Sequence, residues 1–185
     1  NKTMQVSTEE IKKYSKELLK FNSFKCKSKI GINDILDKII CQDIIEVLPC
    51  LKDELFDLVV ADPPYNLMKK FNVVSFNKMS NYKYETWLNT WVVQMFRLLK
   101  ESGSIYVCSE WRSSPMVFNV LNKYFNVRNR ITWEREKGRG AKRNWKNSSE
   151  DIWFATKTGN YTFNVEKVKI RKKVIAPYID KNGIA

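Results

Sequence analysis

Histidine is missing from this chain of 185 residues, and its absence excludes several kinds of chemistry. A Ser–His or Cys–His pair needs imidazole as its general base, and many metal centres need it as a ligand. The four cysteines are irregularly spaced and contain no C-x-x-C pair, which indicates neither a zinc site nor a disulfide framework. Any chemistry must therefore rely on carboxylates, lysine, tyrosine, backbone groups or a bound cofactor. Reduced thiols and a cytoplasmic location are expected.

Long apolar runs are also missing, since no stretch approaches the roughly 18 residues of a membrane span. Hydrophobic residues still make up 43% of the chain and aromatic residues 13%, which is typical of a globular protein. A chain of this length supports one domain with a real core.

Acidic residues are outnumbered, with 20 Asp/Glu against 33 Lys/Arg and a net charge of +13. Strong positive charge attracts polyanions, of which nucleic acid is the usual one. The surplus is concentrated at residues 128–173, which hold 14 Lys/Arg and 5 Asp/Glu. Within this region, residues 137–146 mix glycines, basic side chains and Trp145, which suits a loop that follows a phosphate backbone. The alternative is a solvated basic loop without a specific partner.

The most informative segment is Asp62-Pro63-Pro64-Tyr65, which follows the apolar run at 58–61. Each proline fixes its own φ at about −65° and lacks an N–H donor. Each also restricts the residue before it to extended geometry, so the turn is stiff. A carboxylate, outward carbonyls and the flat face of Tyr65 suit a planar group that bears an NH2. The alternative is an ordinary turn, because Asp and Pro are common turn residues.

Hydrophobic periodicity predicts one α/β unit preceded by a helical extension at residues 1–30. Helices are predicted at 8–20, 44–51, 84–99 and 114–124, the first capped by Ser7 or Thr8. Strands are predicted at 39–41, 55–61, 104–108, 130–133 and 151–155, with a loop at 66–82. Alternating strands and helices predict a mostly parallel sheet with helices on both faces. In such sheets ligands bind beyond the carboxyl ends of the strands, where we expect Asp62 to Tyr65.

The ordered motifs resemble those of the β class of DNA amino-methyltransferases. Asp-Pro-Pro-Tyr after an apolar strand looks like the catalytic motif of this family, and Gln42-Asp43 matches its opening segment. Further matches are Gly103 to Val107, Ile131 to Trp133 and Glu150 to Lys157, so the resemblance covers roughly residues 39–165. It implies a Rossmann-like methyltransferase fold that binds S-adenosylmethionine and no metal.

The resemblance also implies roles for particular residues. Asp62, Pro63, Pro64 and Tyr65 would form the catalytic site, in which Tyr65 stacks on an extruded base. Asp43 and Asp62 would contact the cofactor, although Asp43 could instead be the N-cap of the helix that starts at Ile44. The candidate DNA contacts are Trp133, Arg139, Lys142, Arg143 and Lys146. The alternative for Trp133 is a core position on a strand.

Glycine is scarce, and none of the six glycines forms the glycine-rich segment with which this family binds its cofactor. We therefore expect a catalytic half at 31–127 and a basic target-recognition and DNA-contact region at 128–175. The glycine-rich cofactor segment is expected beyond residue 185, so the fold is expected to be incomplete in this chain.

The expected function is site-specific adenine-N6 methylation of double-stranded DNA within a restriction–modification system. Cytosine N4 or an adenine in RNA is the alternative acceptor, and a non-catalytic nucleic-acid-binding fragment or subunit is a third reading. A homodimer and a cognate restriction enzyme stay open as partners.

Overall fold

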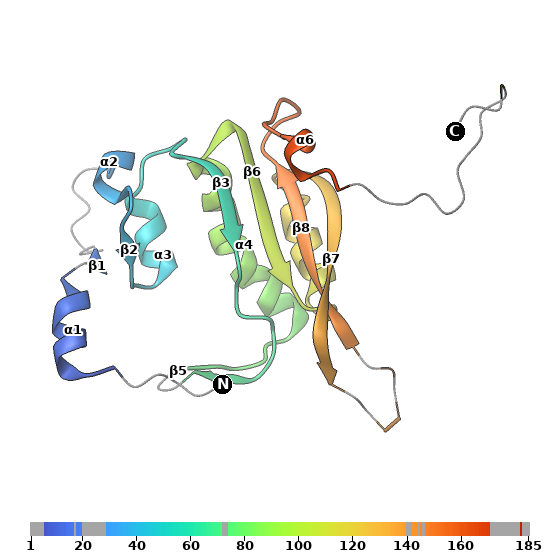
Figure 1. Cartoon of the computed structure of the whole chain (residues 1–185), viewed down its shortest axis with the longest axis horizontal. Coiled ribbons are helices and arrows are strands. Elements are labelled where there is room, and N and C mark those ends of the chain that lie inside the picture. Colours follow the sequence, from blue (N-terminus) through green and yellow to red (C-terminus); the bar gives the residue numbers. More distant parts are fainter. Residues whose placement is uncertain are drawn as a thin grey trace.

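The computed structural model describes residues 6–16, 18–19, 29–71, 74–139, 142–143, 145, 147–170 and 182. Its centre is a four-stranded sheet with the strand order β3-β6-β8-β7 (Figure 1). The strands are β3 (Phe56–Ala61), β6 (Leu99–Ser109), β7 (Asn126–Arg139) and β8 (Asn147–Thr156). β3 runs parallel to β6, whereas β8 is antiparallel to both β6 and β7.

Two helices, α4 (Asn81–Leu98) and α5 (Ser114–Leu121), pack on one face of this sheet (Figure 1). The apolar residues of α4 recur at helical spacing, and Leu88 and Leu98 are completely buried. They share one core with Ile105 and Val107 of β6. None of the described helices is long and apolar enough to cross a membrane.

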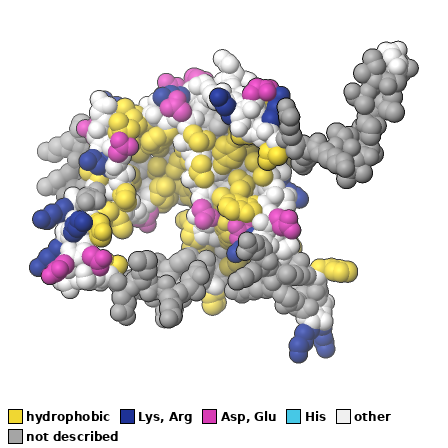
Figure 2. Space-filling model, viewed as in Figure 1, with side chains coloured by type: hydrophobic (Ala, Val, Ile, Leu, Met, Phe, Trp, Pro, Cys, Tyr) yellow, Lys and Arg dark blue, Asp and Glu magenta, His cyan; other side chains and the backbone are white. Residues whose placement is uncertain are grey.

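The opposite face of the sheet carries exposed hydrophobic side chains. Side chains alternate along a strand, so Leu58 and Val60 of β3 point away from α4. They are 55% and 68% exposed. Figure 2 shows hydrophobic side chains gathered over this part of the molecule.

The predicted α/β class is confirmed, but the sheet is mixed and not mostly parallel. The reason is that β7 and β8 form one long hairpin around the basic loop, and a hairpin pairs its strands antiparallel. Within the described part of the chain, α4 and α5 cover only one face of the sheet, where helices on both were expected.

The N-terminal elements depart most from the sequence prediction. Helix α1 (Thr8–Ser15) is capped by Ser7, one of the two predicted N-caps, whose side chain forms a capping box with Glu10. It does not continue to residue 20, because Leu18–Leu19 forms β1 and pairs in parallel with β2 (Ile39–Ile40). The remaining elements here are α2 (Ile32–Ile35), α3 (Ile44–Val47) and the 3-10 turn η2 (Leu48–Cys50).

Three smaller features were not predicted. The segment 66–82 contains two short antiparallel strands, β4 (Lys69–Phe71) and β5 (Val74–Phe76), where a loop was expected. A short helix, α6 (Val165–Val168), follows β8. Cys50 is disulfide-bonded, which corrects the expectation of reduced thiols throughout, whereas Cys41 and Cys108 are free.

An irregularity in the pairing of β6 with β3 gives the first prediction, since Leu99 is opposite Phe56 and Ser104 is opposite Leu58. A Cβ atom added at Gly103 would lie 2.8 Å from Leu99 Cδ2 and 2.9 Å from the Lys100 carbonyl oxygen. The carbonyl belongs to the backbone and cannot move cheaply, so Gly103→Ala should lower the free energy of unfolding by about 1–3 kcal/mol. Urea denaturation measures the change. Gly159→Ala is the matched control, because a Cβ there meets nothing within 4 Å, and equal effects of the two substitutions would contradict the prediction.

Candidate active site

The segment Asp62 to Tyr65 lies at the carboxyl end of β3, as predicted. In the parallel pairing, Val60 is opposite Tyr106 and Ala61 is opposite Val107 of β6. Asp62 therefore follows the last paired residue, at the edge where both strands end. This edge is where α/β proteins bind their ligands.

On the core side, buried polar side chains form hydrogen bonds to the backbone around the turn after β3. Tyr84 of α4 is completely buried, and its hydroxyl donates a hydrogen bond of 2.8 Å to the Pro64 carbonyl. Burial raises the pKa of Tyr84 to about 12, so the hydroxyl keeps its proton at neutral pH. The buried Asn66 donates to the Met79 carbonyl at 2.9 Å and accepts from the Met79 N–H at 2.7 Å. These bonds turn the Pro64 carbonyl inward and fix the backbone next to Asp62.

Two carboxylates and a thiol surround the Tyr65 hydroxyl. The hydroxyl donates to Glu150 Oε2 at 3.5 Å, and Glu150 Oε1 pairs with Arg135 Nη1 at 2.6 Å. Burial raises the pKa of Tyr65 most, and hydrogen bonding to Asp62 and the charges of Asp62 and Glu150 raise it further. Burial and then the same two carboxylates raise the pKa of the Cys108 thiol. Tyr65 and Cys108 are therefore neutral donors beside two acidic groups.

Sequence reasoning assigned no site role to two residues of this cluster, Cys108 and Glu150, and Glu150 was the harder one to find. It lies 85 residues from Tyr65 along the chain and reaches the site only through the antiparallel pairing of β6, β8 and β7. Ser109, the last residue of β6, is opposite Asp151, so Glu150 lies just beyond the end of β6. Only knowledge of this register could have identified it.

The candidate DNA-contacting residues lie on or near the β7–β8 hairpin. Trp133 is paired with Glu150 across the two strands, so both side chains share one face. It is 61% exposed, which removes the alternative of a core position. Lys142 and Arg143 are exposed, and Figure 2 shows basic side chains at the far end of the hairpin. Arg139 is the last residue of β7, and Lys146 lies outside the described residues.

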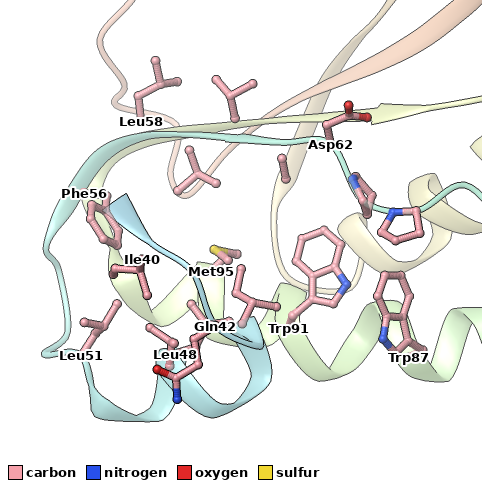
Figure 3. A pocket seen from close by; sticks show the side chains of 17 residues that line it. Ile40, Gln42, Leu48, Leu51, Phe56, Leu58, Asp62, Trp87, Trp91 and Met95 are labelled. Carbon is pink, nitrogen blue, oxygen red and sulfur yellow. The ribbon is translucent and has the colours of Figure 1, made fainter. Parts of the chain in front are cut away.

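A cavity of about 600 Å³ runs along the outer edge of β3, between this strand and α3 and α4 (Figure 3). Its lining is apolar except for Gln42 and Asp62. The ring of Trp91 also lines it, and Trp91 Nε1 is the one buried side-chain polar atom, among those described, without a hydrogen-bond partner.

Asp43, a predicted cofactor contact, is exposed and does not line this cavity. Its Oδ1 accepts a hydrogen bond of 2.8 Å from the Ile45 N–H and caps α3, which was the alternative role. A cofactor contact by Asp43 stays a proposal that rests on family resemblance. Within the described part of the chain, no group of three or more acidic or cysteine side chains could hold a metal ion.

An acid, a stiff Pro-Pro turn and an aromatic ring lie at the end of a parallel strand beside an apolar cavity, which is the arrangement that the resemblance to α/β amino-methyltransferases implies. Residues 56–175 match the N6/N4 DNA methylase family model. The chain belongs to this family.

Relatives with known activities include two bacterial enzymes. The chain is 30% identical to the type II methyltransferase M.HpaI of Haemophilus parainfluenzae over 141 residues, 74% of this chain and 44% of the relative. It is 30% identical to the DNA adenine methyltransferase YhdJ of Escherichia coli K12 over 137 residues, 73% of this chain and 46% of the relative. The chain thus spans less than half the length of these relatives.

Solved structures support the fold. The cytosine-N4-specific PvuII DNA methyltransferase superposes with a TM-score of 0.58 at 20% identity, over 71% of this chain and 52% of that one. A putative DNA modification methylase of Thermus thermophilus, solved in complex with S-adenosyl-L-methionine, gives a TM-score of 0.50 at 19% identity, over 66% and 54% of the two chains. At these identities the likeness shows a common fold.

The hydrogen bond from Tyr84 generates a second prediction. Tyr84→Phe leaves the inward-facing Pro64 carbonyl without its donor, which should lower the free energy of unfolding by about 1–3 kcal/mol. Chemical denaturation followed by circular dichroism measures this. Tyr82→Phe removes the same hydroxyl from a side chain that is 79% exposed and should have no effect. A stability loss of the same size in both variants would show that the Pro64 contact is not the cause.

Proposed function

We propose that the protein is an S-adenosylmethionine-dependent DNA methyltransferase that methylates adenine N6 in double-stranded DNA, as part of a restriction–modification system. The observation that carries the proposal is Asp62-Pro63-Pro64-Tyr65 at the carboxyl end of β3 in a member of the N6/N4 DNA methylase family. Relatives described as type II methyltransferases and as a DNA adenine methyltransferase support it. Asp at position 62 favours adenine by family resemblance. Cytosine N4 is the second candidate acceptor, because a cytosine-N4-specific enzyme shares the fold.

In the proposed mechanism the target base leaves the duplex and enters the site with its exocyclic amine toward Asp62. The Asp62 carboxylate and the Pro63 carbonyl accept the two amine hydrogens. This draws the nitrogen lone pair out of conjugation with the ring. Tyr65 offers one face for stacking, and the exposed Trp133 is the candidate for a second.

S-adenosylmethionine supplies an electrophilic methyl group on a sulfonium centre. With the cofactor bound, the amine nitrogen would take up this methyl group and the sulfur would leave as the neutral thioether S-adenosylhomocysteine. The part that falls to the chain is Asp62, which would accept the displaced amine proton. Most of the rate acceleration is expected from alignment of the reacting atoms, since the protein itself forms no bond to the substrate. The stiff, anchored strand end suits this task.

The cavity beside β3 fits the proposed cofactor. About 300–1,000 Å³ is usual for small-molecule sites, which are mostly apolar with a few polar groups. Here Gln42 and Asp62 are the polar groups, and the orphaned Trp91 N–H would find an acceptor in an occupant that reaches it. Asp62 lies at the junction of this cavity and the acceptor side of the site.

We further propose that a glycine-rich cofactor segment from outside residues 1–185 adds a strand at the outer edge of β3, fills the part of the cavity along Phe56 to Ala61 and leaves the end at Asp62 for the cofactor. Among the described strands, β3 pairs only with β6, so its other edge is open to a further strand. The exposed Leu58 and Val60 would be covered by the same addition. A fragment without that segment would bind DNA without methylating it.

The role of Asp62 has a direct test in the complete gene product. Asp62→Ala should lower the rate of methyl transfer to DNA by about 10²-fold or more. The substitution removes the carboxylate that accepts a hydrogen bond from the amine and later takes up its proton. Transfer of tritiated methyl groups to DNA measures the rate. Asp57→Ala is the control, since Asp57 lies on the same strand and pairs with Lys100 at 2.8 Å, away from the site. Undiminished transfer by Asp62→Ala would refute the assigned role.

The DNA surface has a separate test. Replacing Arg139, Lys142 and Arg143 together with Ala should weaken duplex binding, and the slope of log K against log salt should fall by up to about three units. Fluorescence anisotropy over a range of salt concentrations measures both effects. The control replaces Lys12, Lys13 and Lys16 of the α1 region, which are exposed and carry the same total charge. Equal slope changes in both variants would mean that net charge, and not this loop, binds the DNA.

A further inference from the structure

Glu150 lies beside the candidate active site, and the mechanism above gives it no task. Each oxygen of its carboxylate accepts a hydrogen bond from a different side chain. Oε2 accepts the Tyr65 hydroxyl at 3.5 Å, and Oε1 accepts Arg135 Nη1 at 2.6 Å. A side chain from β8 is thus connected to the turn after β3.

The Tyr65 hydroxyl has a single proton and two carboxylates that compete for it. In the structure the hydroxyl donates to Glu150 at 3.5 Å, and Asp62 competes for it as a second negative charge close to the phenol oxygen. One O–H group can serve one acceptor fully. The distance of 3.5 Å to Glu150 exceeds the roughly 2.7 Å of a typical O–H···O bond, so this bond is weak and the hydroxyl can turn to Asp62 when Glu150 is removed.

This competition matters because of what Asp62 has to do. A hydrogen bond from Tyr65 to Asp62 would occupy an oxygen lone pair of the carboxylate that is to accept the hydrogens of the substrate amine. We propose that Glu150 is a positioning residue that draws the Tyr65 hydroxyl away from Asp62 and so keeps the Asp62 carboxylate available to the amine. The inference rests on the proposed function.

Arg135 holds Glu150 in place for this role. The Arg135 and Glu150 side chains are 55% and 23% exposed, and ion pairs with this exposure contribute little to stability. The pair instead orients one carboxylate oxygen, which leaves the other directed at Tyr65. The cross-strand pairing of Glu150 with Trp133 fixes the position of its backbone.

The decisive experiment compares three variants of the complete gene product in steady-state methyl transfer. Glu150→Ala should lower kcat by about tenfold while KM for DNA changes by less than about twofold, because the loss falls on the reacting geometry. The double variant Tyr65→Phe/Glu150→Ala should recover to within about threefold of Tyr65→Phe alone, since no hydroxyl is left to compete for Asp62. A merely structural role of Glu150 would give no such recovery.

Glu134→Ala is the matched control, because Glu134 is exposed and pairs with Ser149, so it lies on the other face of the sheet from Trp133 and Glu150. It should keep the wild-type kcat. Wild-type kcat in Glu150→Ala, or a double variant no faster than Glu150→Ala, would overturn the inference while the proposed function stands. A wild-type protein that transfers no methyl group would overturn the proposed function, and this inference with it.

A second measurement tests the geometry without methyl transfer. Glu150 is one of the charges that raise the pKa of Cys108, together with Asp62. Glu150→Gln should therefore lower this pKa and shift alkylation of Cys108 by iodoacetamide to lower pH, as measured by mass spectrometry of the peptide that contains it. Glu134→Gln should leave the profile unchanged. An unchanged profile in Glu150→Gln would show that its carboxylate does not face the site, which overturns the inference.

Discussion

The parallel pairing of β3 with β6 is the constraint on which the candidate site depends. Parallel strands in register end at the same edge of a sheet, so Asp62 and Cys108 become neighbours although α4 separates their strands in the sequence. β6 then pairs with β8, which brings Glu150 to the same edge. Shifting β3 by one residue would send Asp62 to the face covered by α4 and α5 and bury its carboxylate.

The turn after β3 is held rigidly on its core side and is exposed on its solvent side. Tyr84 and Asn66 satisfy buried backbone groups and hold the Pro-Pro turn from the core side. Asp62 and Trp133 remain exposed on the other side, where a base and a DNA backbone would approach. The same division explains why substitutions at Tyr84 should affect folding first, whereas those at Asp62 or Glu150 should affect turnover. The β7–β8 hairpin and the apolar cavity lie on separate sides of the turn at Asp62 to Tyr65 (Figure 1).

Local features of the site could be predicted from the sequence, and long-range ones could not. The strand end at Asp62 and helix α4 were predictable, since a Pro-Pro turn and a 3.6-residue period are local signals. Leu18 and Leu19 were misassigned to a helix because their spacing matches one, while their pairing with β2 depends on distant residues. The partnership of Glu150 with Tyr65 was invisible because it depends on the register of β6, β8 and β7. That register in turn depends on strands whose exposed, charged residues show no clean alternation.

Mass spectrometry of nucleosides from genomic DNA tests the central claim most directly. The complete gene would be expressed in a host that lacks DNA methylation of its own, and the DNA would be digested to nucleosides. The account predicts N6-methyldeoxyadenosine in cells that express the protein, and none in cells with the empty vector. N4-methyldeoxycytidine in place of the adenine product, or no methylated nucleoside at all, would contradict it.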